Sequence, residues 1–272
     1  MRALYVDLDG TLLGRRASLL HDADGEFTLL GVRALEACSR IGAEVILYSG
    51  RRRAQVFEDA RMIGQGSYIF EAGAGLVLDG ELTWLTGGLE PSEEAGSIHE
   101  QITASGAPAL LLEHYSGRLE YHSPWHVDRE VSHLFRGHVD ALEADALLEE
   151  RGLGHLRLVD NGNVARREYL TGLEQTRAYH LVPAAASKAG AVAAHMRARG
   201  YARDDVIAVG DSREDMGAAG VVGTFWLVAN ALQKDPTIAE AIAQHSNVRV
   251  AEERNGAGVY EAVVTTLAER RG

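Results

Sequence analysis

Cysteine, lysine and long apolar runs are scarce in this chain, and each scarcity excludes a class of protein. The 272 residues include a single cysteine, Cys38, so no intramolecular disulfide can form. No apolar run approaches transmembrane length, and the N-terminus enters an apolar strand without a charged leader. The formal net charge of -12 argues against a general nucleic-acid binder. We therefore expect a cytoplasmic protein, a monomer or homodimer, with no nucleic-acid or membrane partner.

The composition suits a protein with a substantial core, since 46% of the residues are hydrophobic. Apolar strands alternate with helical segments along the chain, and this order favours an α/β fold. We expect a Rossmann-like parallel-sheet core with helices on both faces and right-handed crossovers between its strands. Polar residues that follow successive strands should then meet at one edge of the sheet.

The pattern changes between about residue 85 and residue 180. Two adjacent strands, a helical region and a further strand are expected there, at residues 110–114, 118–122, 126–151 and 155–159. This change predicts an inserted α+β cap domain at 85–180. The core domain would then consist of residues 1–84 and 181–272.

Two carboxylates follow the first expected strand. Asp7 and Asp9 are two residues apart on extended backbone, so both can face one point where the strand ends, and Gly10 permits a sharp turn. A hard divalent cation would relieve their repulsion, and Mg²⁺ suits oxygen ligands beside substrate phosphates. Acidic residues and glycine also occur in ordinary turns, and an Asp-x-Asp pair occurs in metal-dependent glycosyltransferases.

A second apolar strand, residues 206–210, runs into Asp211 and Asp215. These two residues can share a face if a helical turn begins there. Together with Asp7 and Asp9 they predict a site in which four carboxylates surround one Mg²⁺ ion. Helix N-terminal capping is an equally good interpretation of Asp211 and Asp215 taken alone.

Lysine usage singles out two positions, because only Lys188 and Lys234 are lysines among the 27 basic residues. Lys188 follows Ser187, which can cap a helix, and a lysine is unfavourable at a helix start, where anions are preferred. A compact ammonium there suits a phosphate, although a solvated lysine in a first helical turn is the alternative. Lys234 has the weaker claim, because residues 232–236 are typical of an exposed helix start.

The strand expected at residues 43–48 ends in Ser49, Gly50 and Arg51. Ser49 can donate its hydroxyl to a phosphoryl oxygen, and Gly50 allows close approach of the backbone to that phosphate. Ser49 taken alone is better explained as a turn or cap residue. Arg51 is a candidate substrate contact.

Four motifs occur in order along the chain: Asp7 to Thr11, Ser49, Lys188, and Gly210 to Asp215. In residues 1–84 and 181–272 the chain resembles the haloacid dehalogenase superfamily of aspartyl-phosphate hydrolases, which carries motifs of this kind in this order. The long interval before the third motif is similar to that of the subgroup with a large α/β cap at this point. That subgroup includes Cof-type sugar phosphatases, sucrose-phosphatase and phosphomannomutase.

The resemblance implies a Mg²⁺-dependent phosphomonoester hydrolase acting on a small phosphorylated metabolite, a sugar phosphate or glycosyl-phosphoglycerate. It implies that Asp7 attacks phosphorus to form an aspartyl phosphate, while Asp9 protonates the leaving group and later activates water. It also implies that Mg²⁺ joins Asp7, Asp211 and the phosphate. Lys188 and Ser49 would stabilise the phosphoryl oxygens together with the cation.

Two positions depart from the subgroup's pattern. Ala72 stands in place of the Asn of a Glu-Asn-Gly stretch, and Glu214 stands where Asn is common. In the expected cap, Arg118, His122 and Arg166 are candidate contacts for the part of the substrate that does not react, although surface charge is their ordinary role.

Other functions stay open at this point. A phosphosugar mutase would use the same covalent step and return the phosphoryl group to a rotated sugar. A noncatalytic phosphometabolite-binding protein would not need both Asp7 and Asp9. A glycosyltransferase would leave Lys188 and the second acidic strand end without a role.

Overall fold

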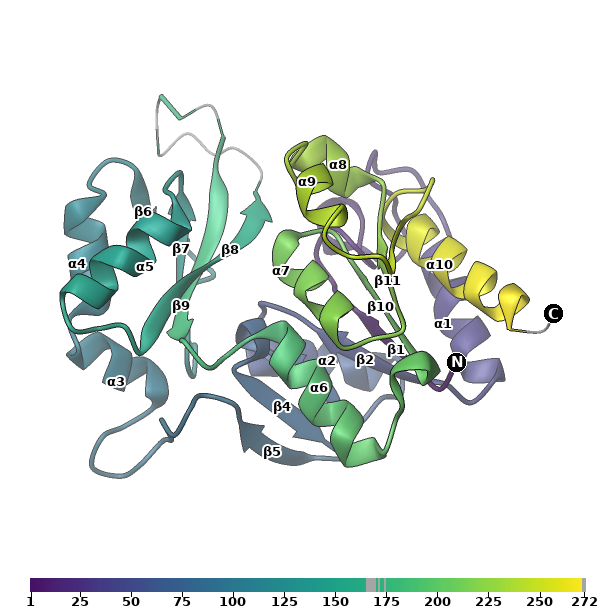
Figure 1. Cartoon of the computed structure of the whole chain (residues 1–272), viewed down its shortest axis with the longest axis horizontal. Helices are drawn as coiled ribbons and strands as arrows, with labels where there is room; N and C mark the ends of the chain where they lie inside the picture. The colour runs from purple at the N-terminus through teal and green to yellow at the C-terminus, as the bar shows by residue number, and fades with distance from the viewer. Residues whose placement is uncertain (165–169, 171, 174, 271–272) are drawn as a thin grey trace.

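The computed structural model describes residues 1–164, 170, 172–173 and 175–270. This part of the chain contains one sheet of eight strands and one of four. Figure 1 shows the smaller sheet and its helices on the left, beside a larger unit that contains both chain termini. Among the described helices, none combines the length and the apolar character that crossing a bilayer requires.

The larger sheet has the strand order β12-β11-β10-β1-β2-β3-β4-β5. It is parallel from β12 to β3 and antiparallel from β3 to β5. Its strands are β1 (Ala3–Val6), β2 (Glu44–Tyr48), β3 (Tyr68–Phe70), β4 (Gly75–Leu78), β5 (Glu81–Trp84), β10 (Val206–Gly210), β11 (Thr224–Leu227) and β12 (Val248–Val250).

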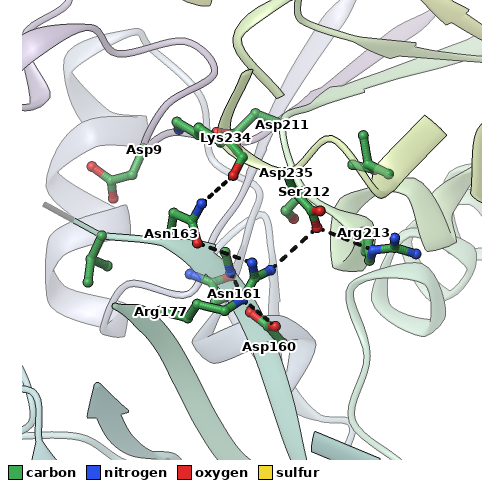
Figure 2. Close-up of a pocket in the computed structure, with 13 residues that line it drawn as sticks. Asp9, Asp160, Asn161, Asn163, Arg177, Asp211, Ser212, Arg213, Lys234 and Asp235 are labelled. Carbon is green, nitrogen blue, oxygen red and sulfur yellow. Dashed lines mark hydrogen bonds and ion pairs between the residues drawn. The ribbon is translucent and has the colours of Figure 1, made fainter. Parts of the chain in front are cut away.

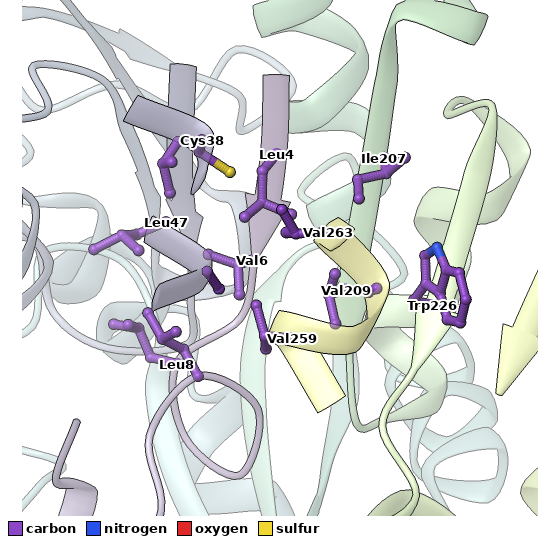
Figure 3. Close-up of a cluster of buried hydrophobic side chains, with 14 of the residues drawn as sticks. Leu4, Val6, Leu8, Cys38, Leu47, Ile207, Val209, Trp226, Val259 and Val263 are labelled. Carbon is purple, nitrogen blue, oxygen red and sulfur yellow. The ribbon is translucent and has the colours of Figure 1, made fainter. Parts of the chain in front are cut away.

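Helices cover both faces of this sheet. In β1 the side chains alternate, so that Leu4 and Val6 belong to one hydrophobic cluster and Ala3 and Tyr5 to another. The first cluster includes side chains of α1 and α10, as Figure 3 shows, and the second includes side chains of α6. The helices of this unit are α1 (Leu30–Arg40), α2 (Arg53–Met62), α6 (Lys188–Arg199), α7 (Arg213–Met216), α8 (Asn230–Lys234), α9 (Ile238–Ile242) and α10 (Asn255–Glu269). The predicted α/β fold is therefore confirmed.

The smaller sheet has the order β6-β7-β9-β8 and is antiparallel throughout. With its helices it surrounds a separate hydrophobic cluster. Its elements are α3 (Ile98–Ala104), α4 (Ala107–His114), β6 (Leu119–Tyr121), β7 (His133–Gly137), α5 (Ala141–Glu150), β8 (Leu156–Asn163) and β9 (Arg177–Pro183). Because β9 crosses residue 180, we propose that the cap extends from residue 85 to Pro183.

Two predictions inside the cap are wrong. Residues 110–114 belong to α4 and not to a strand, because Gly106 with a positive φ and Pro108 in the first turn begin a helix there. A short apolar run does not by itself distinguish a strand from a buried helix. The helical region expected at 126–151 is interrupted by β7, whose residues are all buried and therefore show no alternation.

Candidate active site

Three carboxylates meet at the carboxyl edge of the larger sheet. Asp7 follows β1 and Asp211 follows β10, which are neighbouring strands, and Asp215 lies in the short helix α7. One carboxylate oxygen from each of these residues lies within 4.8 Å of the others. We call Asp7, Asp211 and Asp215 the carboxylate cluster. It contains three of the four residues predicted to surround a cation.

Lys188 joins two members of the carboxylate cluster. Its Nζ lies 2.9 Å from Asp7 Oδ1 and 2.5 Å from Asp215 Oδ1. The lysine is the first residue of α6, whose N-cap Ser187 accepts a hydrogen bond from the Gly190 amide. Burial works to lower the pKa of the Lys188 ammonium, but the carboxylates of Asp215 and Asp7 outweigh it and raise that pKa. Lys188, which the resemblance implies as a phosphate contact, thus lies against the carboxylate cluster.

Asp7 itself is buried, and burial raises the pKa of its carboxyl while the Lys188 ammonium opposes that shift. A cation bound at the carboxylate cluster would oppose it further. The charged form of Asp7, which a nucleophile requires, therefore depends on positive charge around it.

Asp215 takes part in helix capping, one of the two interpretations that the sequence allows, and it also lies in the carboxylate cluster. Its Oδ2 accepts hydrogen bonds from the Ser212 hydroxyl at 2.6 Å, the Ser212 amide at 3.1 Å and the Asp211 amide at 3.2 Å. Ser212 caps α7 in return by accepting from the Asp215 amide. The other oxygen, Oδ1, faces Lys188. Capping thus fixes the Asp215 carboxylate in the orientation that brings Oδ1 to the cluster.

Lys234 is a site residue to which the sequence analysis gave too little weight. It is the last residue of α8, not an exposed helix start, and its Nζ donates to Asp211 Oδ2. Burial works to lower the pKa of Lys234, but Asp211 outweighs it and raises that pKa. Both lysines of the chain therefore contact the carboxylate cluster, and the scarcity of lysine was the signal that pointed to Lys234.

Asp9 does not join the carboxylate cluster. Arg51 draws its carboxylate away through two hydrogen bonds, from Nε at 2.6 Å and from Nη2 at 2.7 Å. Arg51 also donates to Asp59 Oδ2 at 2.7 Å. The structure thus places Asp9 at the wall of a pocket and occupies Arg51, a predicted substrate contact, with two carboxylates.

Ser49 and Gly50 follow β2, next to Asp7 across the sheet. Ser49 is buried, and its Oγ accepts from the Arg51 amide at 3.3 Å. This contact agrees with the turn interpretation of Ser49. The short loop formed by Ser49, Gly50 and Arg51, called the Ser49–Arg51 loop below, approaches the cap.

A polar pocket lies between the core and the cap, beside Asp9 and Asp211 (Figure 2). The core also contributes Ser212, Arg213, Lys234 and Asp235, and the cap contributes Asp160, Asn161, Asn163 and Arg177. None of these cap residues was predicted, because only the antiparallel pairing of β8 with β9 brings residues 160 and 177 together.

Ion pairs and hydrogen bonds cross this pocket. Arg177 pairs with Asp160 of the cap at 2.6 Å and reaches Asp235 of the core at 3.6 Å. Asn163 Nδ2 donates to the backbone carbonyl of Lys234. Figure 2 shows this chain of contacts from β8 and β9 to the segment that carries Lys234.

The predicted cap contacts lie elsewhere. Arg118 donates to the His138 carbonyl at 3.1 Å, and its guanidinium lies 5.7 Å from the centre of the Tyr115 ring. His122 follows β6, and its amide donates to the Leu134 carbonyl. Neither residue lines the pocket of Figure 2. Arg166 lies outside the described residues.

The carboxylate cluster fits a divalent cation by its chemistry. Three hard oxygen donors converge at one point, which is the donor type that Mg²⁺ takes in proteins. Lys188 and Lys234 provide two positive charges against three carboxylates, so negative charge remains to hold a cation.

No family model matches the chain. The chain is 27% identical over 265 residues to a phosphoglycolate phosphatase of Archaeoglobus fulgidus, and the aligned region covers 96% of this chain and 95% of that protein. The chain is also 24% identical over 269 residues to a phosphoglycolate phosphatase of Methanoculleus marisnigri, and that aligned region covers 97% of this chain and 95% of that protein.

Solved structures of similar fold match along nearly the whole chain. The sucrose-phosphatase of Synechocystis, solved with sucrose and phosphate, has a TM-score of 0.65 at 15% identity and covers 98% of both chains. A haloacid dehalogenase-like hydrolase of Bacteroides thetaiotaomicron has a TM-score of 0.60 at 16% identity and covers 97% of this chain and 98% of that chain.

Proposed function

We propose that this chain, which has the fold and the motif order of haloacid dehalogenase phosphatases, is a Mg²⁺-dependent phosphomonoester hydrolase. Its resemblance to that superfamily and to the sucrose-phosphatase-like subgroup, predicted from four motifs, is confirmed. The predicted class of enzyme, a phosphatase, is the class of its named relatives. The substrate that we propose is a small phosphorylated metabolite, such as a sugar phosphate.

The contact of Lys188 with both Asp7 and Asp215 carries this proposal. A buried ammonium between two carboxylates neutralises negative charge at the point where a phosphoryl group would arrive. It thereby reduces the repulsion between the Asp7 carboxylate and the anionic phosphate. Asp7 then attacks phosphorus, and the ester oxygen leaves as an aspartyl phosphate forms on the Asp7 side chain. Mg²⁺, held by Asp7, Asp211 and Asp215, would withdraw charge from the phosphoryl oxygens when bound.

Asp9 would serve as the acid and base of the two steps. Its carboxylate lies at the pocket wall, outside the carboxylate cluster, and the two hydrogen bonds from Arg51 fix its orientation. To act in the first step, Asp9 would have to turn from Arg51 and take up a proton from solvent, which it would then give to the leaving oxygen. In the second step it would take a proton from the attacking water. Its separation from the cluster supports this division of roles.

The polarity of the pocket supports a hydrophilic substrate. Carboxylate, amide and guanidinium groups line it, and they come from both core and cap. The curated relatives are named phosphoglycolate phosphatases, and the Synechocystis structure holds sucrose and phosphate, so both relatives and neighbour bind small hydrophilic molecules.

A phosphate-release assay tests the proposed function. The panel contains hexose phosphates, phosphoglycolate, a glycosyl-phosphoglycerate and a generic aryl phosphate, each with Mg²⁺ and with EDTA. We expect release from at least one metabolite that EDTA abolishes and Mg²⁺ restores. An isomerised sugar phosphate without free phosphate would instead identify a mutase, and turnover unaffected by EDTA would contradict the metal requirement.

A further inference from the structure

The Ser49–Arg51 loop is held by all three of its backbone carbonyls. The Ser49 carbonyl accepts from the Ala72 amide at 3.1 Å, and the Arg51 carbonyl accepts from the Glu71 amide at 3.0 Å. The Gly50 carbonyl accepts from Nη1 of Arg129, a cap residue, at 3.1 Å. The Gly50 amide, in contrast, donates to no acceptor within the described part of the chain. The loop therefore keeps one amide free for a ligand.

Arg129 is itself held by three hydrogen bonds and by an ion pair with Glu71, whose Oε2 lies 4.0 Å from Nη1. Its side chain is only 3% exposed. Besides Gly50, it donates to the Trp125 carbonyl at 3.0 Å and to the Ser132 hydroxyl at 2.9 Å. Its Nε donates to the Trp125 carbonyl, and its Nη1 donates to both the Ser132 hydroxyl and the Gly50 carbonyl, so the direction of the Gly50 contact is defined.

Glu71 of the core anchors the cap segment that carries Arg129. This fully buried carboxylate accepts from the amides of Glu130, Val131 and Ser132 at 2.9, 3.1 and 2.6 Å, and from the Ser132 hydroxyl at 2.9 Å. Glu71 and Ala72 have φ values of 46° and 56°, in the left-handed region that non-glycine residues rarely adopt. Such a strained turn persists where its surroundings determine it, and here its amides bind the Ser49–Arg51 loop.

Cap side chains also close directly over Gly50. A Cβ at this position would lie 2.6 Å from His180 Nε2 and 3.2 Å from Asn161 Nδ2, so only glycine fits without a shift. His180 is buried on β9 and contacts the Ser132 hydroxyl through Nδ1 at 3.2 Å. The cap thus touches this loop through Arg129, His180 and Asn161.

We propose that Arg129 is a positioning residue through which the cap sets the conformation of the Ser49–Arg51 loop for phosphate binding. The inference rests on the proposed function, because it takes this loop as the phosphate contact. Arg129 fixes the Gly50 carbonyl and, in the same peptide plane, the Arg51 amide, which donates to Ser49 Oγ and so orients that hydroxyl. Without that contact the loop would become ordered only when phosphate binds. The entropic cost of ordering it would then lower the affinity of the protein for phosphate.

Calorimetric titration of the full chain with inorganic phosphate, in the presence of Mg²⁺, tests this role. We expect Arg129→Met to raise the Kd for phosphate about tenfold. This is the size of effect expected from losing one hydrogen bond that involves a charged group, here the bond from Arg129 to the Gly50 carbonyl. The KM of the best substrate should rise by a similar factor while kcat changes less, as expected for contacts made before and during the reaction.

Arg53→Met is the matched control. Arg53 donates to Glu130 at 2.8 Å and so also joins α2 to the same cap segment, but within the described residues no hydrogen bond or ion pair joins its side chain to the Ser49–Arg51 loop. The phosphate affinity of Arg53→Met should stay within about twofold of that of the original chain. This change is well below the tenfold effect expected for one lost hydrogen bond of a charged group. Equal losses in both variants would mean that any damage to the segment weakens binding, and would overturn the specific role of Arg129.

Thermal unfolding of each variant shows whether it is folded, and Arg129→Lys and Ser132→Ala carry the test if Arg129→Met fails to fold. Lysine keeps the charge but cannot make all three contacts, so an intermediate affinity is expected. A folded Arg129 or Ser132 variant that binds phosphate as tightly as the original chain would overturn the positioning role alone. An original chain that neither hydrolyses phosphomonoesters nor binds phosphate would overturn the proposed function as well.

Discussion

At the scale of single residues, two ammonium groups balance much of the charge of the carboxylate cluster. Lys188 lies between Asp7 and Asp215, and Lys234 lies against Asp211. Arginine takes the other 25 of the 27 lysine and arginine positions in the chain. A compact ammonium fits between closely spaced carboxylates where a planar guanidinium would not.

Replacing Lys188 by Met is expected to reduce kcat by about 100-fold or more, because removal of one preorganised electrostatic contact typically costs this much. The variant should also melt at a lower temperature, since Asp7 and Asp215 would stay buried without their ammonium partner. Steady-state kinetics at saturating Mg²⁺ and a thermal melt measure the two effects.

Arg197→Met, on the exposed side of the same helix, serves as the control for Lys188→Met and should retain full activity. Retention of more than half of the original kcat by Lys188→Met would contradict the proposed role of the lysine.

The residues of the site differ in how far the sequence could predict them. Asp7, Ser49 and Asp211 follow apolar strands, and the geometry of a parallel sheet alone brings strand ends together. Asp9 was placed with them because an extended strand puts alternate residues on one side, but the chain turns at Gly10 and Arg51 binds the carboxylate. Lys234 comes to the site only through the packing of α8.

At the scale of elements, a polar network joins the start of β2 to the end of α6. Glu44 accepts from Arg199 at 2.8 Å and from the Tyr201 hydroxyl at 2.8 Å. Arg199 also reaches Asp79 in the β4–β5 turn. These contacts hold the helix that carries Lys188 at its other end.

The stability of this network should depend on acid pH. Burial works to raise the pKa of Glu44, but hydrogen bonds from His195, Arg199 and Tyr201 outweigh it and lower that pKa to about 2. A carboxyl with a depressed folded-state pKa stabilises the fold above its unfolded pKa, about 4.5, and loses that contribution as the pH falls toward 2.

Urea unfolding of the original chain and of Glu44→Gln at pH 7 and pH 3 measures this contribution. The difference in unfolding free energy should be larger at pH 7 than at pH 3. An equal difference at both values would show that the charge of Glu44 does not stabilise the fold.

The elements of the core were easier to predict than those of the cap. Parallel strands buried on both faces form continuous apolar runs, such as Ala3–Val6 and Val206–Gly210, which the sequence displays directly. In the cap, α4 is a short apolar run, and β7 is a buried segment of five residues that includes His133 and Arg136, so neither length nor periodicity separates helix from strand there.

At the scale of the whole molecule, the cap contacts the core on two sides of the site. On one side Arg177 and Asn163 reach the segment of Lys234 and Asp235. On the other side Glu71 holds the cap segment that precedes β7. The spacing of the motifs predicted that an insertion would be present, but the residues it presents depend on how its strands pair.

Arg177→Met should raise the KM of the best substrate several-fold, because its pairing with Asp160 and Asp235 orders the pocket wall. The affinity for inorganic phosphate should change little, since the phosphoryl group would lie at Asp7 and Lys188. Kinetics and phosphate titration separate the two effects, and Arg151→Met, exposed at the end of α5, is the control. A loss of phosphate affinity equal to the rise in KM would contradict this division of the site.

The rate of phosphate release by Asp7→Asn shows whether Asp7 is the nucleophile. The assay uses the best substrate with saturating Mg²⁺, and Asp204→Asn, an exposed aspartate outside the site, is the control. The proposed mechanism predicts a folded Asp7→Asn protein with no detectable turnover beside a fully active Asp204→Asn protein, because the amide cannot form the aspartyl phosphate. Substantial Mg²⁺-dependent release by folded Asp7→Asn would contradict the assignment of Asp7 as the nucleophile.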